Sequence, residues 1–204
     1  MLTRRLFVAC AALLAVSSWA GRSVLAQADA GAGAFIQSLG NEAIATFSDK
    51  SVPRDQSVQK FRTLLYRGFD VPYIGRFVLG RFWNQATPQQ QDEYQKLFEK
   101  MIVATYADRF VEYSGETFKI TGSRPEGDTD AVVTTQIVRP NGPPVNVDWR
   151  VRKRDAGFKI IDVIVEGVSM SVTQRSEFAS VISSSGGQIE GLLRAMRQKT
   201  GTAG

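Results

Sequence analysis

Apolar residues recur with helical spacing through the part of the chain that follows residue 30. Within residues 30–48 they fall three or four positions apart, the period of an amphipathic helix. The side chains that share this face are Phe35, Leu39, Ala43, Ile44 and Phe47. The same spacing runs from Pro53 to Gly68, where glycine is a typical helix stop. A short helical stretch from Pro72 to Leu79 follows, so the first eighty residues predict three helices.

The segment Thr87-Pro88-Gln89-Gln90 has the pattern of a capping box with proline at the first helical position. Such a box marks a helix start, because the Thr and Gln side chains bond each other's backbone N–H groups. Apolar residues with helical spacing continue from there to about Tyr113. We therefore predict that the longest helix covers residues 87–113.

The period changes to two after Gly115, which indicates β-strands. Residues 117–120 alternate, residues 131–138 are rich in β-branched side chains, and residues 145–152 again alternate. A last strand at 158–166 follows the turn at 155–157. Short turns between consecutive strands predict an antiparallel meander. Two more helices, at about 171–184 and 187–199, are divided by a Gly-Gly pair.

This order of elements predicts an α+β fold. We expect a curved antiparallel sheet of four to five strands with helices packed on one face. The pattern shows neither an internal repeat nor a second domain, so residues 29–204 are predicted to form one domain.

The first 28 residues have the features of a cleaved export signal. Arg4 and Arg5 precede an apolar run, and small residues offer cleavage after Ala26 or Ala28. The run is too short for a bilayer core, which takes about 20 residues. The two arginines also fit a twin-arginine signal, so either export route is open. We expect the mature protein in the periplasm.

Composition then excludes several function classes. The chain has 25 basic and 20 acidic residues. Three of the basic residues and none of the acidic ones lie in the predicted signal, which leaves the mature part at +2. This balance gives no support for a nucleic-acid partner. The chain has no His, and its single Cys10 lies in the signal, so we expect no catalytic residue, no cofactor and no metal site.

The strands suggest where a ligand would bind. The last strand is apolar on both of its faces, which is typical of a strand that is buried on both sides or lines a cavity. Strand alternation and apolar bulk select the candidate cavity residues Phe77, Val133, Ile137, Val147, Trp149, Ile161 and Val163. Arg76 and Arg81, among five aromatic side chains in residues 69–83, are candidates for a headgroup or partner contact.

Three segments carry a recognisable pattern: residues 69–83 (FDVPYIGRFVLGRFW), 113–125 (YSGETFKITGSRP) and 147–178 (VDWRVRKRDAGFKIIDVIVEGVSMSVTQRSEF). In this order they resemble the MlaC (toluene-tolerance) family of periplasmic phospholipid-binding proteins. The resemblance implies that the sheet and helices enclose an apolar lipid pocket, and that the protein is a carrier with bound phospholipid as its cargo. Its partners would be an outer-membrane lipoprotein complex and an inner-membrane ABC lipid transporter complex, which together maintain outer-membrane lipid asymmetry. We expect a monomer.

Other functions also fit the sequence. A branch of the same family is associated with hopanoid synthesis. An enzyme on a cone-shaped sheet of the ketosteroid-isomerase kind would need a buried base, Asp148 or Asp162, that points into the cavity beside a tyrosine. A plain interaction module with a filled core is the third possibility.

Overall fold

The computed structural model describes residues 20–49, 51–111 and 114–201. The helices in this part of the chain are α1 (Ala20–Phe47), α2 (Arg54–Gly68), α3 (Val71–Leu79), the 3₁₀ helix η1 (Gly80–Gln85), α4 (Pro88–Val111), α5 (Met170–Ser184) and α6 (Ile189–Lys199). The strands are β1 (Thr117–Glu126), β2 (Asp130–Val138), β3 (Val145–Arg154), β4 (Gly157–Val165) and β5 (Val168–Ser169). The predicted α+β class is confirmed.

Local sequence signals set the helix boundaries. At the start of α4, the Thr87 amide donates to Gln90 Oε1 at 3.1 Å, and the Gln90 amide donates to Thr87 Oγ1 at 3.2 Å. The predicted capping box is therefore formed. Asp70 caps α3 by accepting from the Tyr73 amide. Gly80 ends α3 with a positive φ of 59°, a conformation that glycine adopts without steric cost.

The five strands pair in chain order as an antiparallel meander, as predicted. Their register places one set of apolar side chains toward α1, which we call the inner face. Its main members are Phe118, Ile137, Val147, Trp149, Val151, Ile160 and Val163.

A bulge in β4 interrupts the alternation along this strand. Trp149 pairs with Val163 and Val151 pairs with Ile160, so β4 has one residue more than β3 between these pairs. The extra residue places Ile160 and Val163, which are an odd number of positions apart, on the same face. The extra residue is Ile161, which has no partner on β3, so the expected uninterrupted period of two does not hold along β4.

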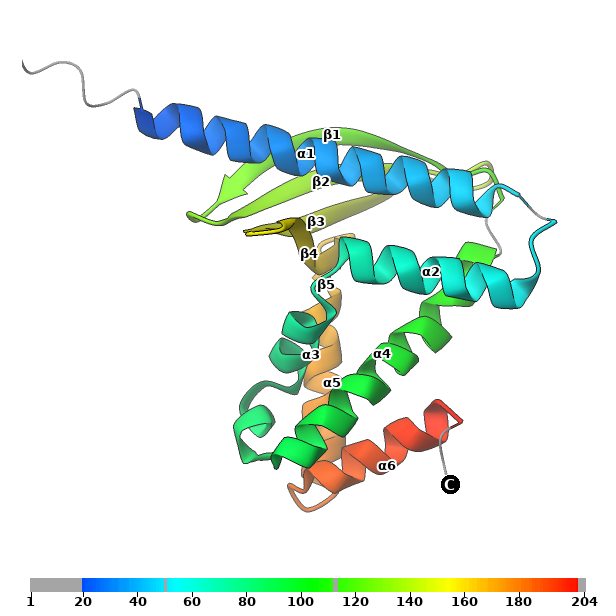
Figure 1. Cartoon of the computed structure of the whole chain (residues 1–204), viewed down its shortest axis with the longest axis vertical. Helices are drawn as coiled ribbons and strands as arrows, with labels where there is room; N and C mark the ends of the chain where they lie inside the picture. Colours follow the sequence, from blue (N-terminus) through cyan, green and yellow to red (C-terminus); the bar gives the residue numbers. More distant parts are fainter. Residues whose placement is uncertain (1–19, 50, 112–113, 202–204) are drawn as a thin grey trace, which may run out of the picture.

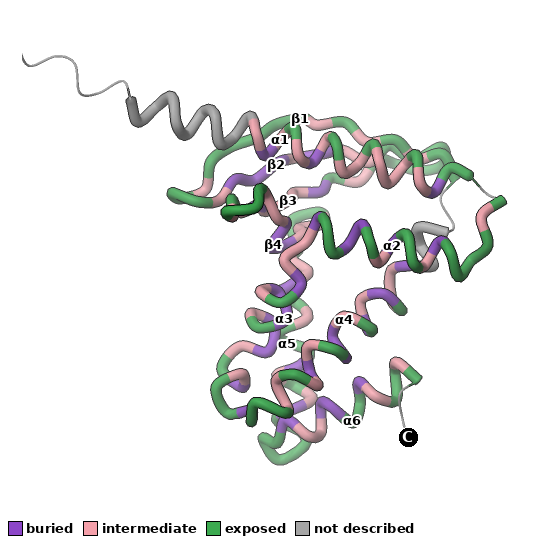
Figure 2. The backbone as a smooth tube through the Cα atoms, in the orientation of Figure 1, coloured by how far each residue is buried: buried purple, intermediate pink, exposed green. Residues whose placement is uncertain are grey.

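The helices form two groups around the sheet (Figure 1). Helix α1 lies across the inner face, and α2 runs beside it. Helices α3, α4, α5 and α6 pack on one another beyond the sheet, around the rings of Tyr94, Phe98 and Phe178. The result is two clusters of buried residues, one among the helices and one between α1 and the sheet. Figure 2 marks the buried residues along the backbone.

The cluster between α1 and the sheet is small and tightly closed. Its buried members are Ala32, Ile36, Ala131, Val133, Val151 and Ile160. A β-carbon on Gly31 would lie 2.9 Å from the ring of Phe158, so glycine at this position allows α1 to lie directly on the strand. We call this group the packed cluster.

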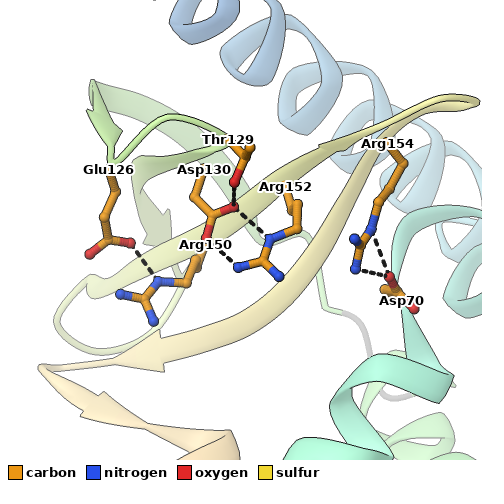
Figure 3. Close-up of polar contacts among 7 residues, drawn as sticks. All are labelled: Asp70, Glu126, Thr129, Asp130, Arg150, Arg152 and Arg154. Atoms are coloured by element: carbon orange, nitrogen blue, oxygen red, sulfur yellow. Dashed lines mark hydrogen bonds and ion pairs between the residues drawn. The ribbon is translucent and has the colours of Figure 1, made fainter.

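The opposite face of the sheet carries charges that are paired with one another. Arg150 binds Glu126, Arg152 binds Asp130 through two hydrogen bonds, and Arg154 binds Asp70 (Figure 3). The Arg150 guanidinium holds the pKa of Glu126 below its usual value. Because Asp70 also caps α3, its pair with Arg154 joins the sheet to the second group of helices.

The predicted export signal is only partly within the described residues. Residues 1–19 lie outside them, and both predicted cleavage positions fall within α1, which starts at Ala20. The cleavage itself stays a prediction. None of the described helices has the length and apolar character needed to cross a bilayer.

Candidate functional site

A cavity of about 400 Å³ lies between α1, α2 and the inner face of the sheet. This volume is within the range of about 300–1,000 Å³ that is usual for ligand sites. Nearly all of its wall is apolar. The lining residues are Ile36, Leu39, Gly40, Ala43, Ile44, Phe47, Phe61, Leu64, Leu65, Phe69, Glu116, Thr117, Phe118, Ile137, Val147, Trp149, Ile160, Val163 and Val165.

The cavity lies between the two clusters of buried residues. Phe47, Phe61 and Leu64 on its wall belong to the helical cluster. Ile36 and Ile160 belong to the packed cluster. Protein cores normally fill such a junction at close to crystal density, with few voids larger than a water molecule. An apolar space of this size between two packed cores is therefore a binding-site candidate.

Helices α1 and α2 are held against each other over the cavity. A β-carbon on Gly68 would lie 2.6 Å from a methyl carbon of Leu39, so the two helices touch at this glycine. Glu42 of α1 forms an ion pair with Arg67 of α2 at the surface. Lys159 of β4 donates to the carbonyl oxygens of Tyr66 and Arg67 at 2.8 and 2.7 Å, which fixes the end of α2 on the sheet.

The polar groups in the sheet wall are bonded within the wall. The Trp149 indole donates its Nε1–H to Thr135 Oγ1 at 2.9 Å, and that hydroxyl donates to the Val147 carbonyl at 3.1 Å. Thr135 is fully buried. Since a buried polar group without a partner costs about 1–3 kcal/mol, this chain lets Trp149 present an apolar ring to the cavity.

The two ends of the cavity differ in chemistry. Glu116 and Thr117, at the start of β1, are the charged and the hydroxyl-bearing residues of the wall, and they lie at the same end of the sheet as Val165. The Glu116 carboxylate accepts from the Ser114 amide and hydroxyl at 2.7 and 2.8 Å. We call this the polar end. The opposite end is closed by Ile36 and Ile160 of the packed cluster.

The structure places four of the seven predicted cavity residues on the wall: Ile137, Val147, Trp149 and Val163. The other three lie elsewhere. Val133 is on the inner face but is fully buried under α1 in the packed cluster, where no space remains. Ile161 lies at the β4 bulge, off the cavity wall. Phe77 packs in the helical group, with the Arg175 guanidinium 5.2 Å from its ring centre.

Arg76 and Arg81 are also away from the cavity. Both are exposed side chains on the α3–η1 segment. The Arg76 guanidinium lies 5.7 Å from the centre of the Trp83 ring, and that of Arg81 lies 4.9 Å from the centre of the Phe82 ring. Arg76 and Arg81 are therefore not placed to contact a lipid headgroup in the cavity.

The carboxylates required by an enzyme do not lie on the cavity wall. Asp162 is buried, and it accepts from the Ser169 hydroxyl at 2.6 Å and from the Ser171 amide at 3.1 Å. It thereby fixes the turn into α5. Asp148 neighbours Trp149 on its strand and points to the opposite face. Among the described residues, no group of three His, Cys, Asp or Glu side chains could hold a metal ion.

The helical half of the wall was missed as a site. The sequence predicts Leu39, Ala43, Ile44 and Phe47 only as one apolar face of a helix. One signal was present in the sequence: Gly40 and Ala43 are small residues on that face. A β-carbon on Gly40 would lie 2.3 Å from the Phe118 ring, so the glycine allows α1 to approach β1 while Ala43 leaves space beside it.

Comparisons with known proteins point in one direction. The family model described as MlaC protein matches residues 37–198. The intermembrane phospholipid transport system binding protein MlaC of Haemophilus influenzae is 25% identical over 133 residues, which are 63% of this chain and 61% of that protein. Toluene tolerance protein ttg2D of Pseudomonas putida is 21% identical over 110 residues, 54% of this chain and 51% of that protein. The matches thus span between half and two thirds of these curated relatives.

A solved structure is similar over more of its length. The phospholipid-binding protein of Ralstonia solanacearum, in complex with a phospholipid, superposes with a TM-score of 0.73 at 30% sequence identity. The match covers 83% of this chain and 96% of that chain.

Two charge substitutions on one strand test whether the space beside Val147 is an open cavity or a filled core. Val147 and Val151 lie on the same face of β3, but Val147 lines the cavity and Val151 is in the packed cluster. In Val147→Glu the carboxylate can stay hydrated inside the cavity, so we expect a loss of about 1 kcal/mol in the free energy of unfolding. In Val151→Glu the charge is buried without a partner, and we expect a loss of more than about 4 kcal/mol.

Thermal unfolding of both variants measures the difference, and the fluorescence of an apolar dye reports whether the cavity still accepts a ligand. Val147→Glu should remain folded and lose dye binding. Equal destabilisation of the two variants would show that Val147 packs in a filled core.

Proposed function

Because the chain belongs to the MlaC family, we propose that it carries phospholipid through the periplasm as the binding protein of an ABC-type lipid transport system. In this role it shuttles the lipid between outer-membrane and inner-membrane complexes and so maintains the lipid asymmetry of the outer membrane. The observation that supports the proposal most is the apolar cavity between α1, α2 and the inner face.

The physical task explains why such a cavity is needed. Each methylene group moved from water into an apolar site gains about 0.8 kcal/mol. A two-chain lipid has about 30 of them, so leaving both chains in water costs on the order of 20 kcal/mol. A carrier must therefore shield the chains, and a wall of Leu, Ile, Val and Phe side chains provides that shielding. The phospholipid bound to the Ralstonia solanacearum relative supports the same cargo.

The ends of the cavity suggest how the lipid is oriented. The acyl chains would lie along the apolar wall, with their methyl ends toward Ile36 and Ile160. The headgroup would remain near solvent at the polar end, beside Glu116 and Thr117. No lysine or arginine is part of the described wall, so the phosphate has no dedicated partner there. We therefore expect weak discrimination between headgroups.

A separate surface is suited to a partner protein. Arg76, Arg81 and Arg175 are exposed, and each guanidinium stacks on an aromatic ring of the α3–η1 segment. A β-carbon on Gly80 would lie 2.8 Å from Arg175 Nε, so α5 brings this arginine against the same segment. We call these three the arginine patch. Among the described residues none of them has an ion pair, whereas Arg150, Arg152, Arg154 and Arg197 each bind a carboxylate.

The patch therefore has free donors in a fixed orientation. A guanidinium presents five N–H donors, and stacking reduces the freedom lost when it binds an acidic group. The patch lies on the helices and away from the cavity wall. A partner with acidic residues could hold the carrier there while its cavity stays accessible. Arg76 and Arg81 are thus proposed as partner contacts.

The cargo can be identified directly. Protein purified from a bacterial periplasm is extracted with organic solvent, and the extract is analysed by mass spectrometry. We expect phospholipid at close to one molecule per protein, with headgroups that differ by less than about tenfold from their proportions in the cell, or roughly 1.4 kcal/mol. The Val147→Glu protein is the control and should carry little lipid. An empty wild-type protein that turns over a small substrate would contradict the proposal and favour an enzyme.

The arginine patch can be tested separately from lipid binding. In the triple variant Arg76→Gln, Arg81→Gln, Arg175→Gln we expect the lipid content to be unchanged. Transfer of lipid to membranes that contain the transporter should slow by at least tenfold, because charges at a docking surface mainly change the association rate.

A matched control removes the same charge elsewhere. Lys153, Arg194 and Lys199 are exposed and lie on β3 and α6. Their replacement by Gln should leave transfer within about twofold of wild type. If the two triple variants transfer lipid equally slowly, net charge and not the patch is responsible.

A further inference from the structure

The cavity has a definite end, formed by two isoleucines. Ile36 of α1 is 3% exposed and Ile160 of β4 is fully buried. Both residues belong to the cavity wall and to the packed cluster. Behind them, Ala32, Val133 and Val151 are fully buried and fill the space between helix and sheet. The two isoleucines are therefore the surface at which the apolar space stops.

The end is closed because α1 lies directly on the sheet there. Gly31 lies against the Phe158 ring, and the Phe35 and Phe158 rings are 6.1 Å apart. Together with the packed cluster, these contacts fill the space between α1 and the sheet beyond Ile36. A filled region of this kind resists rearrangement, because cores pack at close to crystal density.

The length of the cavity follows from the helix that covers it. The lining residues of α1 run from Ile36 to Phe47. Eleven residues at a rise of about 1.5 Å give about 16 Å along the helix axis. In an extended hydrocarbon chain each carbon advances about 1.25 Å, given a bond length of about 1.5 Å and a bond angle near 111°. The cavity therefore spans about 13 carbons.

We propose that Ile36, supported by Ile160, limits the acyl-chain length of the bound lipid. The inference rests on the proposed function, because it assumes that an acyl chain lies along α1 with its methyl end at the packed cluster. A chain that reaches Ile36 has no further apolar surface to bury. Additional methylenes must then fold back or extend from the polar end into water.

The size of the Ile36 side chain should then set the preferred chain length. Ile36→Ala removes three carbon atoms from the closed end and extends the space, so longer chains are favoured. Ile36→Phe adds bulk and shortens the space. Each methylene gained or lost in the apolar site corresponds to about a fourfold change in affinity, or about 0.8 kcal/mol.

The experiment compares the lipids bound to wild type, Ile36→Ala and Ile36→Phe, after incubation with vesicles that contain phosphatidylcholines of 12, 14, 16 and 18 carbons per chain in equal amounts. Lipid is extracted and quantified by mass spectrometry. In Ile36→Ala we expect the mean chain length to rise by one to two carbons, and in Ile36→Phe to fall. Neighbouring lipids differ by two methylenes in each chain, so for the chain that reaches Ile36 their ratio should change by about sixteenfold.

Val133→Ala is the matched control. Val133 lies in the packed cluster behind the two isoleucines and is not part of the wall. Its truncation creates a cavity and a similar loss of stability, but leaves the closed end in place. The lipid distribution of Val133→Ala should therefore equal that of wild type. A shift of the same size in Val133→Ala would show that loosening of the core, and not the size of Ile36, changes the preference.

The outcomes separate this inference from the proposed function. Wild type that takes up phospholipid, together with an unchanged distribution in both Ile36 variants, overturns the limit at Ile36 and leaves the carrier function standing. Wild type that takes up no lipid overturns both. Shifts of the mean bound chain length in opposite directions in Ile36→Ala and Ile36→Phe support the proposal, even when one of the two variants is less stable.

Discussion

The inner face of the sheet is wider than one helix can cover, and the rest of the structure depends on this mismatch. Four paired strands at a spacing of about 4.8 Å place the outer strands about 14 Å apart, whereas a helix with its side chains is about 10 Å across. Helix α1 therefore covers only part of the face, and α2 lies beside it (Figure 1). Below the two helices, a space remains in front of the wall formed by Val147, Trp149 and Val163. This space is the cavity.

Keeping such a gap open lowers the stability of the empty protein, and the remaining contacts offset this cost. The packed cluster holds α1 on the sheet, and at the same end of the sheet Lys159 and the Arg154–Asp70 pair hold α2 and α3 to β4 and β3. Arg150, Arg152 and Arg154 project from the opposite face of the sheet, where each pairs with a carboxylate (Figure 3). A ligand that fills the cavity stabilises the folded state by an amount that grows with the logarithm of its concentration relative to its dissociation constant. Binding and stability are therefore coupled through the same apolar wall.

The elements could be predicted from the sequence because their signals are local. The capping box at Thr87, the Gly-Gly pair after α5 and the change to a period of two after Gly115 depend only on neighbouring residues. The cavity, in contrast, depends on which helices and strands pack against one another in the fold. The register error at Ile161 came from a bulge, which has no signature in a strand that is apolar on both faces. Val133 was assigned to the correct face but lies under α1, and sequence alone does not show how far along a sheet a helix makes contact.

The central claim is that acyl chains occupy this cavity, and Trp149 is placed to report it. A variant with Trp19→Phe and Trp83→Phe leaves Trp149, on the cavity wall, as the single tryptophan. Its fluorescence is measured while phospholipids with bromine atoms at successive acyl positions are loaded. We expect strong quenching, greatest for bromines in the middle or far part of the chain and weak for those next to the headgroup. Lipid that binds stoichiometrically without quenching Trp149 at any bromine position would contradict the account.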